Sequence, residues 1–408
     1  MPTTMRRLAL AAAALIAALP CLAATGMATA SPAQLMPSAA QETQDVAGDD
    51  FYLPPSPLPA GDPGDIIRSR PSEVGWPSAR AKAWQVMYLS TDALGEPTAM
   101  TGTVLVPEGV DPGSAPIVAF GPGTQGAGFQ CAPSRMISSG AFYEQSGLND
   151  LLHNGFAVAV PDYEGYWPEP ETTYVTGRSM GAAMIDVVRA SQRLADAGLS
   201  ADAKVAFRGY SQGGGAAAWA GELRPDYAPE LNLVGIAAGG IPADPVQLAL
   251  HLDGKQGFGV MAYALIGFDN AYPELDLGSY LNDAGVRAFA EMETVCTLRL
   301  LVDYAGKSIQ DYTHTSPLLR PEWVARYEDN TLGANPPAVP MLQYHATQDE
   351  LVQFGQAKAL RDTYCEAEVP LTWQTLDMGH IDAVYHGNAA VLSFLDARLA
   401  GEPAGTTC

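Results

Sequence analysis

The sequence feature that most constrains this chain is the pentapeptide G-Y-S-Q-G at 209–213, which has the form G-x-S-x-G. The apolar run at 204–207 before it is typical of a strand. The small residues at 214–220 after it are typical of a helix packed closely against a sheet. A sharp turn between such a strand and helix exposes the serine hydroxyl at the top of the sheet. The flanking glycines leave room for that turn, so Ser211 is a candidate nucleophile.

The motif needs support from the rest of the chain, because short matches arise by chance in a sequence with 41 glycines. A serine nucleophile requires a histidine as general base and a carboxylate that orients the histidine. In α/β-hydrolases the three follow in the order Ser, Asp or Glu, His, and each comes directly after a strand. The acid and the base are therefore sought after Ser211.

Short apolar segments alternate with helical segments along most of the chain, as in a parallel sheet covered by helices. Two alternating segments joined by a turn, at 84–90 and 98–106, predict a hairpin before that sheet. The predicted strands that follow lie at 116–120, 155–160, 204–207, 233–238, 340–345 and 371–376. The predicted helices lie at 179–197, from 214 onward, at 353–363 and at 389–399. We therefore predict an α/β fold of the α/β-hydrolase type, with a mostly parallel central sheet.

The N-terminus has the features of a secretory signal. Arg6 and Arg7 precede an apolar stretch at 8–19 that is too short to span a bilayer, and an A-x-A site ends at Ala30. We expect cleavage after Ala30 and a mature protein that is secreted or periplasmic. Later apolar stretches stay below 18 residues, so we expect no stable membrane anchor.

The remaining chain divides by composition. Residues 31–48 are rich in Ala, Ser, Gln and Pro and are expected to form a disordered leader. The proline density at 50–70 argues against regular structure there. Residues 244–330 interrupt the alternation with short helical segments and many aromatic residues. We interpret 244–330 as a helical cap inserted into a core formed by 49–243 and 331–408.

Charge and cysteine content exclude several function classes. With 22 basic and 45 acidic residues, the chain lacks the excess of Lys and Arg that nucleic acids and anionic membranes attract. Removal of the signal leaves four cysteines, Cys131, Cys296, Cys365 and Cys408. In an oxidising compartment they suggest two disulfides, with three possible pairings. Because the chain has no C-x-x-C, we do not expect a structural zinc site.

The acid and the base are sought in the loops after the last two predicted strands. Asp349 follows the strand at 340–345, and His380 follows the strand at 371–376. Both come after Ser211 in the required order.

Other carboxylates and histidines compete less well. Glu350 is adjacent to Asp349 but has a longer side chain, and Asp377 is more typical of a turn residue. His345 lies within a predicted strand, and His386 lies close to a predicted helix. The remaining histidines do not follow a strand: His153, His251 and His314.

An oxyanion hole needs two hydrogen-bond donors. The first is expected to be the backbone N–H of Gln212, at the positive end of the helix that follows Ser211. The second is expected from the glycine-rich loop at 121–126, which follows the strand at 116–120.

The chain resembles the secretory lipase family, the lipase-A type of α/β-hydrolase, over nearly the whole mature sequence. The resemblance rests on F-Y-x-P-P at 51–55, P-G-D-I-I-R-S-R at 63–70, Y-L-S-T-D at 88–92, G-E-P at 95–97, G-T-Q-G at 123–126, C-A-P-S at 131–134, P-D-Y-E-G at 161–165, G-Y-S-Q-G at 209–213, Asp349 and G-H at 379–380.

This resemblance implies a triad of Ser211, Asp349 and His380 under a helical lid. It places the second oxyanion donor at Gln125, where fungal members carry aspartate, so we expect the donor to be the backbone N–H. It also implies the disulfides Cys131–Cys296 and Cys365–Cys408.

Together the residues and the resemblance predict a secreted serine ester hydrolase that acts on acylglycerols or other lipid esters through an acyl-enzyme on Ser211. We expect no cofactor or metal, and transient contact with lipid surfaces through the cap. A short-chain carboxylesterase, or an acyltransferase or serine peptidase with the same triad, is the alternative. A non-catalytic binding protein on this fold would have lost a triad residue, and all three are present.

Overall fold

A nine-stranded sheet runs through the part of the chain that the computed structural model describes, residues 49–76 and 78–408. Its strand order is β1-β2-β3-β5-β4-β6-β7-β8-β9. The strands are β1 (Ile66–Ser72), β2 (Ala81–Thr91), β3 (Pro97–Pro107), β4 (Ile117–Gly121), β5 (Ala157–Tyr163), β6 (Val205–Tyr210), β7 (Leu233–Gly239), β8 (Met341–Ala346) and β9 (Leu371–Leu376). The predicted signal peptide at 1–30 and leader at 31–48 lie outside the described residues.

The sheet is antiparallel at one side and parallel elsewhere. The pairs β1–β2, β2–β3 and β3–β5 are antiparallel, and the pairs from β5–β4 to β8–β9 are parallel. The predicted hairpin is β2–β3, and each predicted strand of the parallel part is present. The predicted α/β-hydrolase fold is thus confirmed. Parallel strands place all their carboxyl ends at one edge of the sheet, where the loops that carry the candidate residues meet.

The prediction that residues 50–70 lack regular structure was wrong in two places. Residues 66–72 form β1, which pairs only with β2 at the edge of the sheet. An edge strand tolerates Pro71, because not every backbone N–H in it must pair. Asp50–Tyr52 form a short 3-10 helix, η3, in which the Asp49 side chain caps the backbone N–H of Phe51.

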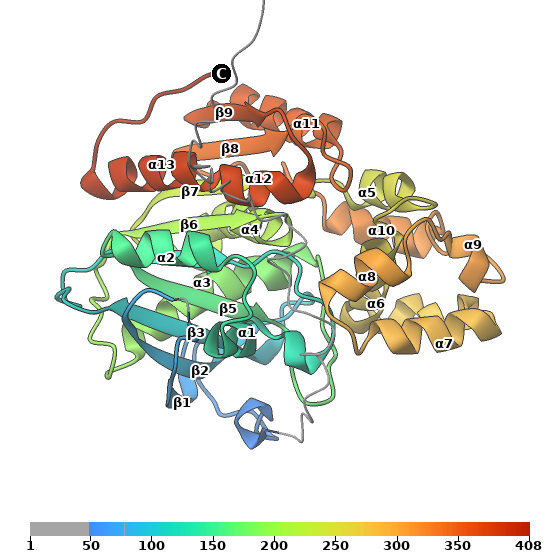
Figure 1. The fold of residues 1–408 in the computed structure, drawn as a ribbon, viewed down its shortest axis with the longest axis horizontal. Coiled ribbons are helices and arrows are strands. Elements are labelled where there is room, and N and C mark those ends of the chain that lie inside the picture. The colour runs from blue at the N-terminus through green and yellow to red at the C-terminus, as the bar shows by residue number, and fades with distance from the viewer. Residues whose placement is uncertain (1–48, 77) are drawn as a thin grey trace, which may run out of the picture.

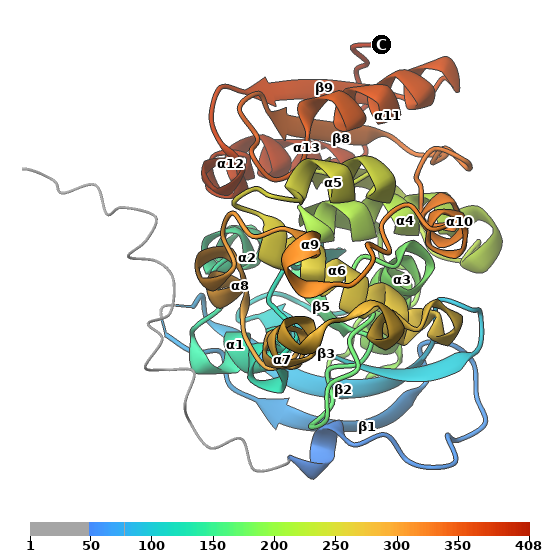
Figure 2. The same cartoon turned by 90° about the vertical axis from the view of Figure 1, so that its right-hand side faces the viewer.

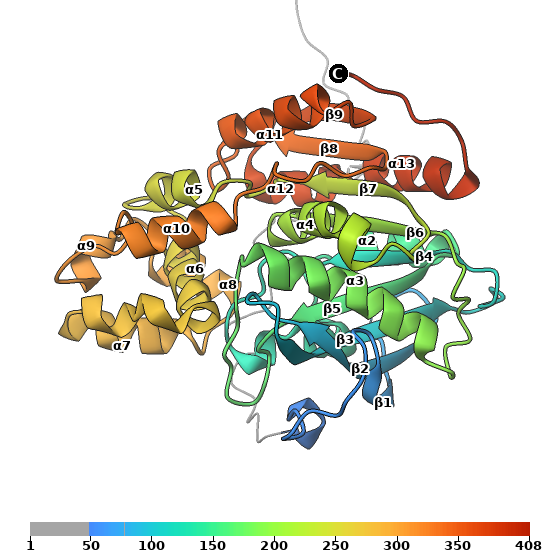
Figure 3. The same cartoon turned by 180° about the vertical axis from the view of Figure 1, so that it is seen from behind.

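Helices cover both faces of the sheet (Figures 1 and 3). The helices on one face are α3 (Gly177–Arg193), α4 (Gln212–Tyr227) and α11 (Phe354–Glu366). The helices on the other are α1 (Pro133–Ser139), α2 (Gln145–His153), α12 (His380–His386) and α13 (Asn388–Ala400). Two large apolar cores result, one on each face.

Between β7 and β8 the chain leaves the sheet and forms a separate group of helices (Figure 2). They are α5 (Pro245–Leu252), α6 (Phe258–Ala271), η5 (Pro273–Leu275), η6 (Leu277–Tyr280), α7 (Asp283–Met292), α8 (Thr297–Asp303), α9 (Ile309–Tyr312) and α10 (Pro321–Asp329). We call residues 245–329 the cap. It lies beyond the carboxyl ends of the parallel strands (Figure 1) and occupies the range for which we predicted a helical insertion.

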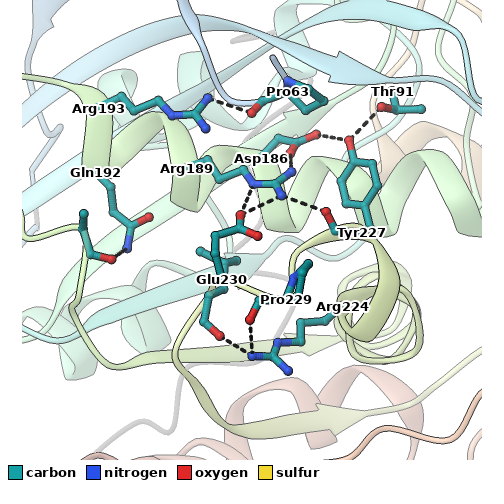
Figure 4. A network of polar contacts seen from close by, with 12 residues as sticks. Pro63, Thr91, Asp186, Arg189, Gln192, Arg193, Arg224, Tyr227, Pro229 and Glu230 are labelled. Atoms are coloured by element: carbon teal, nitrogen blue, oxygen red, sulfur yellow. Dashed lines mark hydrogen bonds and ion pairs between the residues drawn. The ribbon is translucent and has the colours of Figure 1, made fainter.

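A buried polar network ties α3 to its neighbours on the face opposite α2 (Figure 4). The Asp186 carboxylate of α3 accepts hydrogen bonds from Ser90 on β2 and Tyr227 at the end of α4, both at 2.7 Å. Arg189 pairs with Asp186 at 2.9 Å and with Glu230 at 2.7 Å. Burial raises the pKa of Asp186 to about 6 despite these partners.

Two disulfides add covalent links, and they are the pairs that the family resemblance implies. Cys131–Cys296 joins the 3-10 helix η4 (Phe129–Cys131) to the start of α8, and so links the core to the cap. Cys365–Cys408 joins α11 to the C-terminal residue. None of the described helices combines the length and the apolar character that a bilayer crossing requires.

Replacing Cys131 and Cys296 with serine should lower the free energy of unfolding more than replacing Cys365 and Cys408. The first disulfide links residues 165 positions apart and the second 43, so the first removes more conformational entropy from the unfolded chain. We expect losses of about 2–5 kcal/mol each, with a difference of about 1 kcal/mol. Urea unfolding of the two double variants measures this, and a larger loss for the second pair would contradict it.

Candidate active site

Ser211 occupies a strained turn between β6 and α4. Its φ of 58° and ψ of −122° are rarely adopted by residues other than glycine. The turn is fixed because the Ser211 N–H donates to Gly239 O at 2.9 Å and the Ser211 carbonyl accepts from Gly215 N at 3.0 Å. A Cβ on Gly209 would lie 2.1 Å from Gly213 O, so the backbone packs too closely for a larger residue. The pentapeptide thus forms the sharp turn that the sequence predicted.

Asp349 and His380 are brought together by the loops after β8 and β9. Asp349 Oδ2 lies 2.7 Å from His380 Nδ1. The other oxygen, Oδ1, accepts from the backbone N–H groups of Leu351 at 3.0 Å and Val352 at 2.7 Å. A carboxylate held in this way at Nδ1 fixes the tautomer that leaves Nε2 free to accept a proton.

The environment of Asp349 favours its charged form. Burial opposes ionisation, but the charge and hydrogen bond of His380, together with the backbone N–H of Val352, outweigh it. The pKa of Asp349 therefore lies below its ordinary value. His345 Nε2 lies 3.3 Å from Asp349 Oδ2 and 2.8 Å from Val352 O. Burial lowers the pKa of His345, which favours the neutral imidazole.

The competing residues have other partners. The Glu350 carboxylate accepts from the backbone N–H of His380 at 2.9 Å, at the start of α12. Asp377 accepts from the side chains of two residues that follow β8. His386 is exposed on α12, with Nδ1 2.9 Å from a backbone carbonyl. The remaining exposed histidines are His153 and His314, and the partly buried His251 contacts Glu350 O.

Ser211 and His380 line one cavity of about 60 Å³ between the sheet and the cap. Gln212 also lines this cavity. It is the first residue of α4, so its backbone N–H lies at the N-terminal end of that helix. The cap contributes an apolar wall from α5, α6 and α8: Leu248, Leu252, Val260 and Leu301. Ser211 and His380 therefore face an apolar chamber that the cap encloses.

The loop at 121–126 contributes Thr124 to this cavity, whereas Gln125 is not among the described residues that line it. The Gln125 side chain donates to Gly123 O at 3.1 Å. The hydroxyls of Thr124 and Tyr174 are 2.6 Å apart. Sequence reasoning missed Thr124, and its only signal was its position within the same loop.

The cap holds this loop directly. Thr297 at the start of α8 donates its N–H to Gln125 O at 2.9 Å and its hydroxyl to Thr124 O at 2.6 Å. Gly126 forms an antiparallel bridge with Cys296, next to the disulfide Cys131–Cys296. The position of the loop thus depends on the cap.

A buried carboxylate holds the same loop from the core side. Glu144 Oε2 accepts from the Gly123 N–H at 2.6 Å. Burial raises the pKa of Glu144 to about 7, although the positive charge of Arg208 and the Gly123 hydrogen bond oppose the rise. Sequence reasoning missed Glu144, because no motif marks a contact between residues 21 positions apart.

Comparison with known proteins shows which family the chain belongs to. Residues 132–407 match the family model described as secretory lipase. The chain belongs to the secretory lipase family. It is 32% identical to Lipase 10 of Candida albicans, over 88% of this chain and 82% of that protein. It is 30% identical to the secreted triacylglycerol lipase LIP1 of Malassezia furfur, over 88% and 77%.

The fold of this secretory lipase matches the X-ray structure of Candida antarctica lipase A. The TM-score is 0.80 at 24% identity, over 88% of this chain and 87% of that one. Family membership makes the protein a carboxylic ester hydrolase, and this prediction is confirmed.

Glu144→Gln should make stability less dependent on pH. The pKa of Glu144 is raised to about 7 in the folded protein. The stabilisation of the folded state by the protonated carboxyl is therefore fully present below the pKa of Glu144 in the unfolded chain, and it is lost as pH rises through about 7. Glutamine keeps an oxygen for Gly123 and does not ionise. The melting temperature of the variant minus that of the wild type should therefore increase between about pH 5 and about pH 8. A constant difference would contradict this, and the exposed Glu73→Gln serves as the control.

Proposed function

We propose that this protein is a secreted hydrolase of acylglycerols or other lipid esters that acts through an acyl-enzyme on Ser211. One observation carries the proposal: Ser211 and His380, whose Nδ1 is held by Asp349, line a single apolar cavity that the cap encloses. A hydrophobic chamber next to a nucleophile suits an ester with an apolar acyl chain.

In the proposed reaction the Ser211 hydroxyl attacks the ester carbonyl carbon, and His380 Nε2 takes its proton. The tetrahedral intermediate collapses as His380 gives that proton to the leaving alcohol. Water, activated by the same imidazole, then attacks the acyl-enzyme and releases the acid. Asp349 keeps the imidazole oriented and stabilises the positive charge that His380 acquires. The lowered pKa of Asp349 supports this role, because it keeps the carboxylate ionised.

The oxyanion that forms during both steps needs donors aimed at it. We assign the first to the backbone N–H of Gln212, whose residue lines the cavity. We assign the second to the loop at 121–126. The family resemblance favours the Gln125 N–H, and Thr124 is the polar residue of this loop at the cavity wall.

The substrate class is supported by the relatives as well as by the cavity. The relative from Malassezia furfur is named a secreted triacylglycerol lipase. The apolar wall of the cap is the part of this chain that would contact an acyl chain. A short-chain carboxylesterase would have the same triad, so the length of the preferred acyl chain distinguishes the two.

We further propose the division of the chain that the sequence suggested. Residues 1–30 act as a signal that is cleaved after Ala30, which agrees with a family of secretory enzymes. Residues 31–48 form a leader, and 244–330 act as a lid on a core of 49–243 and 331–408.

Purified mature protein should hydrolyse p-nitrophenyl esters, and Ser211→Ala should lower kcat by about 10⁴-fold or more. Asp349→Asn should lower kcat by roughly 10³–10⁴-fold, because the imidazole loses its orienting charge. Asp377→Asn is the matched control, since Asp377 lies in the loop before His380 but bonds elsewhere. A series of acyl chains from acetate to palmitate measures the preference.

Four outcomes would contradict the proposal. A maximum at acetate would reassign the protein to the short-chain carboxylesterases. Transfer to an added alcohol that outruns hydrolysis would indicate an acyltransferase, and cleavage of amides in preference to esters would indicate a peptidase. Activity that survives in Ser211→Ala would exclude Ser211 as the nucleophile.

The cap also supports a proposal of transient contact with a lipid surface. It exposes four large apolar side chains, on α5, α7, α8 and the segment before α10: Leu250, Val286, Val302 and Leu319. Each is more than half exposed to solvent. Exposed apolar groups on the cap, which also forms a wall of the apolar cavity, suit contact with an emulsion droplet.

Val286→Glu combined with Val302→Glu should lower activity on a triacylglycerol emulsion by roughly fivefold or more and leave activity on a soluble short-chain ester unchanged. The reason is the loss of about 1 kcal/mol or more of interfacial burial. Trp76→Glu, at a residue 90% exposed outside the cap, is the control. An equal loss on both substrates would point to damage of the site instead.

A further inference from the structure

A second apolar cavity lies between the cap and the core. It has a volume of about 30 Å³ and is lined by α3, α5, α6 and α10, with Met180, Ala249, Met261, Leu265, Phe268 and Tyr327 among its residues. It shares three lining residues with the cavity of Ser211: Val175, Pro242 and Leu248. These three residues form the junction between the two cavities.

Val175 has an unusual backbone at this junction. Its φ is 56°, in the left-handed region. A β-branched residue is a genuine outlier there, and such a conformation costs about 1–3 kcal/mol. It persists only where the surrounding structure holds it, and such outliers cluster at functional sites. Ser211 is another non-glycine residue with positive φ in this chain.

The cap holds the segment around Val175 from one side. Tyr263 on α6 donates to the Thr172 hydroxyl at 3.0 Å, and Asn270 Nδ2 donates to Thr172 O at 3.1 Å. The ring of Tyr174 stacks on that of Tyr263 with centroids 4.1 Å apart. A Cβ on Gly267 would lie 2.4 Å from Tyr174 N, so α6 packs directly onto this backbone.

The core and the end of the cap hold the same segment from the other side. The Tyr174 hydroxyl forms a hydrogen bond of 2.6 Å with the hydroxyl of Thr124 in the loop at 121–126. The Thr173 hydroxyl donates to the buried carboxylate of Glu164 at 2.8 Å. The Gly177 N–H donates to Asn330 Oδ1 at 2.6 Å. Residues on both sides of Val175 are thus fixed, and the valine side chain cannot leave the junction by a small backbone shift.

We infer that Val175 determines acyl-chain specificity, because its side chain restricts passage from the cavity of Ser211 to the second cavity. This inference rests on the proposed function, in which an acyl chain on Ser211 occupies the first cavity. A short acyl group ends before the junction. A longer one must pass between Val175, Pro242 and Leu248. Pro242 has a rigid ring, and Leu248 is held on α5, so Val175 is the fixed β-branched wall of the passage.

The test measures, for each variant, kcat/KM for a C12 ester divided by kcat/KM for a C4 ester. This ratio does not depend on how much of a preparation is active, so partial unfolding does not affect it. Val175→Ala removes two methyl groups from the junction and should raise the ratio by roughly tenfold. Val175→Phe fills the junction and should lower the ratio by more than tenfold, with C4 hydrolysis retained.

Val324→Ala is the matched control, because it makes the same chemical change on α10 of the cap at a residue that lines neither cavity. Its ratio should stay within about twofold of the wild type. Unchanged ratios in both Val175 variants, or an equal change in Val324→Ala, would overturn the inference. Failure of the proposed function looks different, because the wild type would then hydrolyse neither ester or Ser211→Ala would remain active.

Discussion

The close approach of α4 to the middle of the sheet is the constraint on which the site depends. A Cβ on Gly213 would lie 1.9 Å from Gly121 O, and a Cβ on Gly214 would lie 2.1 Å from Gly239 O. Glycine at these positions lets the helix rest on the ends of β4 and β7. The same contact sets Ser211 in its strained turn and places the N-terminus of α4 beside the loop at 121–126. The candidate nucleophile and the proposed oxyanion donors therefore depend on a single packing arrangement.

Two buried carboxyl groups near the site show how environment decides charge. Asp349 accepts two backbone N–H groups and contacts two imidazoles, and its pKa falls. Glu144 accepts one backbone N–H, and its pKa rises to about 7. For Glu144, burial outweighs the charge of Arg208 and the hydrogen bonds with Gly123 and Tyr143, whereas for Asp349 the charge and hydrogen bond of His380 help to outweigh burial. In the proposed mechanism the first group supplies a permanent negative charge, whereas the second stabilises the loop at 121–126.

Much of the fold followed from local sequence. Apolar runs marked the strands of the parallel sheet, and the order of Ser211, Asp349 and His380 after their strands indicated a triad whose acid and base the structure brings within 2.7 Å. What the sequence could not indicate depends on distant contacts. The β1 strand forms because β2 offers an unpaired edge, and His345 meets Asp349 through the turn between them. The contact of Glu144 with Gly123 and the position of Thr124 in the cavity arise only when α2 and the cap pack around the loop.

The attachment of α8 to the loop at 121–126 has a consequence for access to the site. Cys296 and Thr297 of the cap are joined to that loop by the hydrogen bonds of Thr297 and by the bridge at Gly126, and the disulfide links Cys296 to Cys131 just after the loop. The cap cannot move away from the core at the place where these contacts hold it. In the proposed mechanism, an opening of the cap that leaves the proposed oxyanion donors in place must pivot about these contacts, and the entrance for a lipid ester then lies at the opposite margin of the cap.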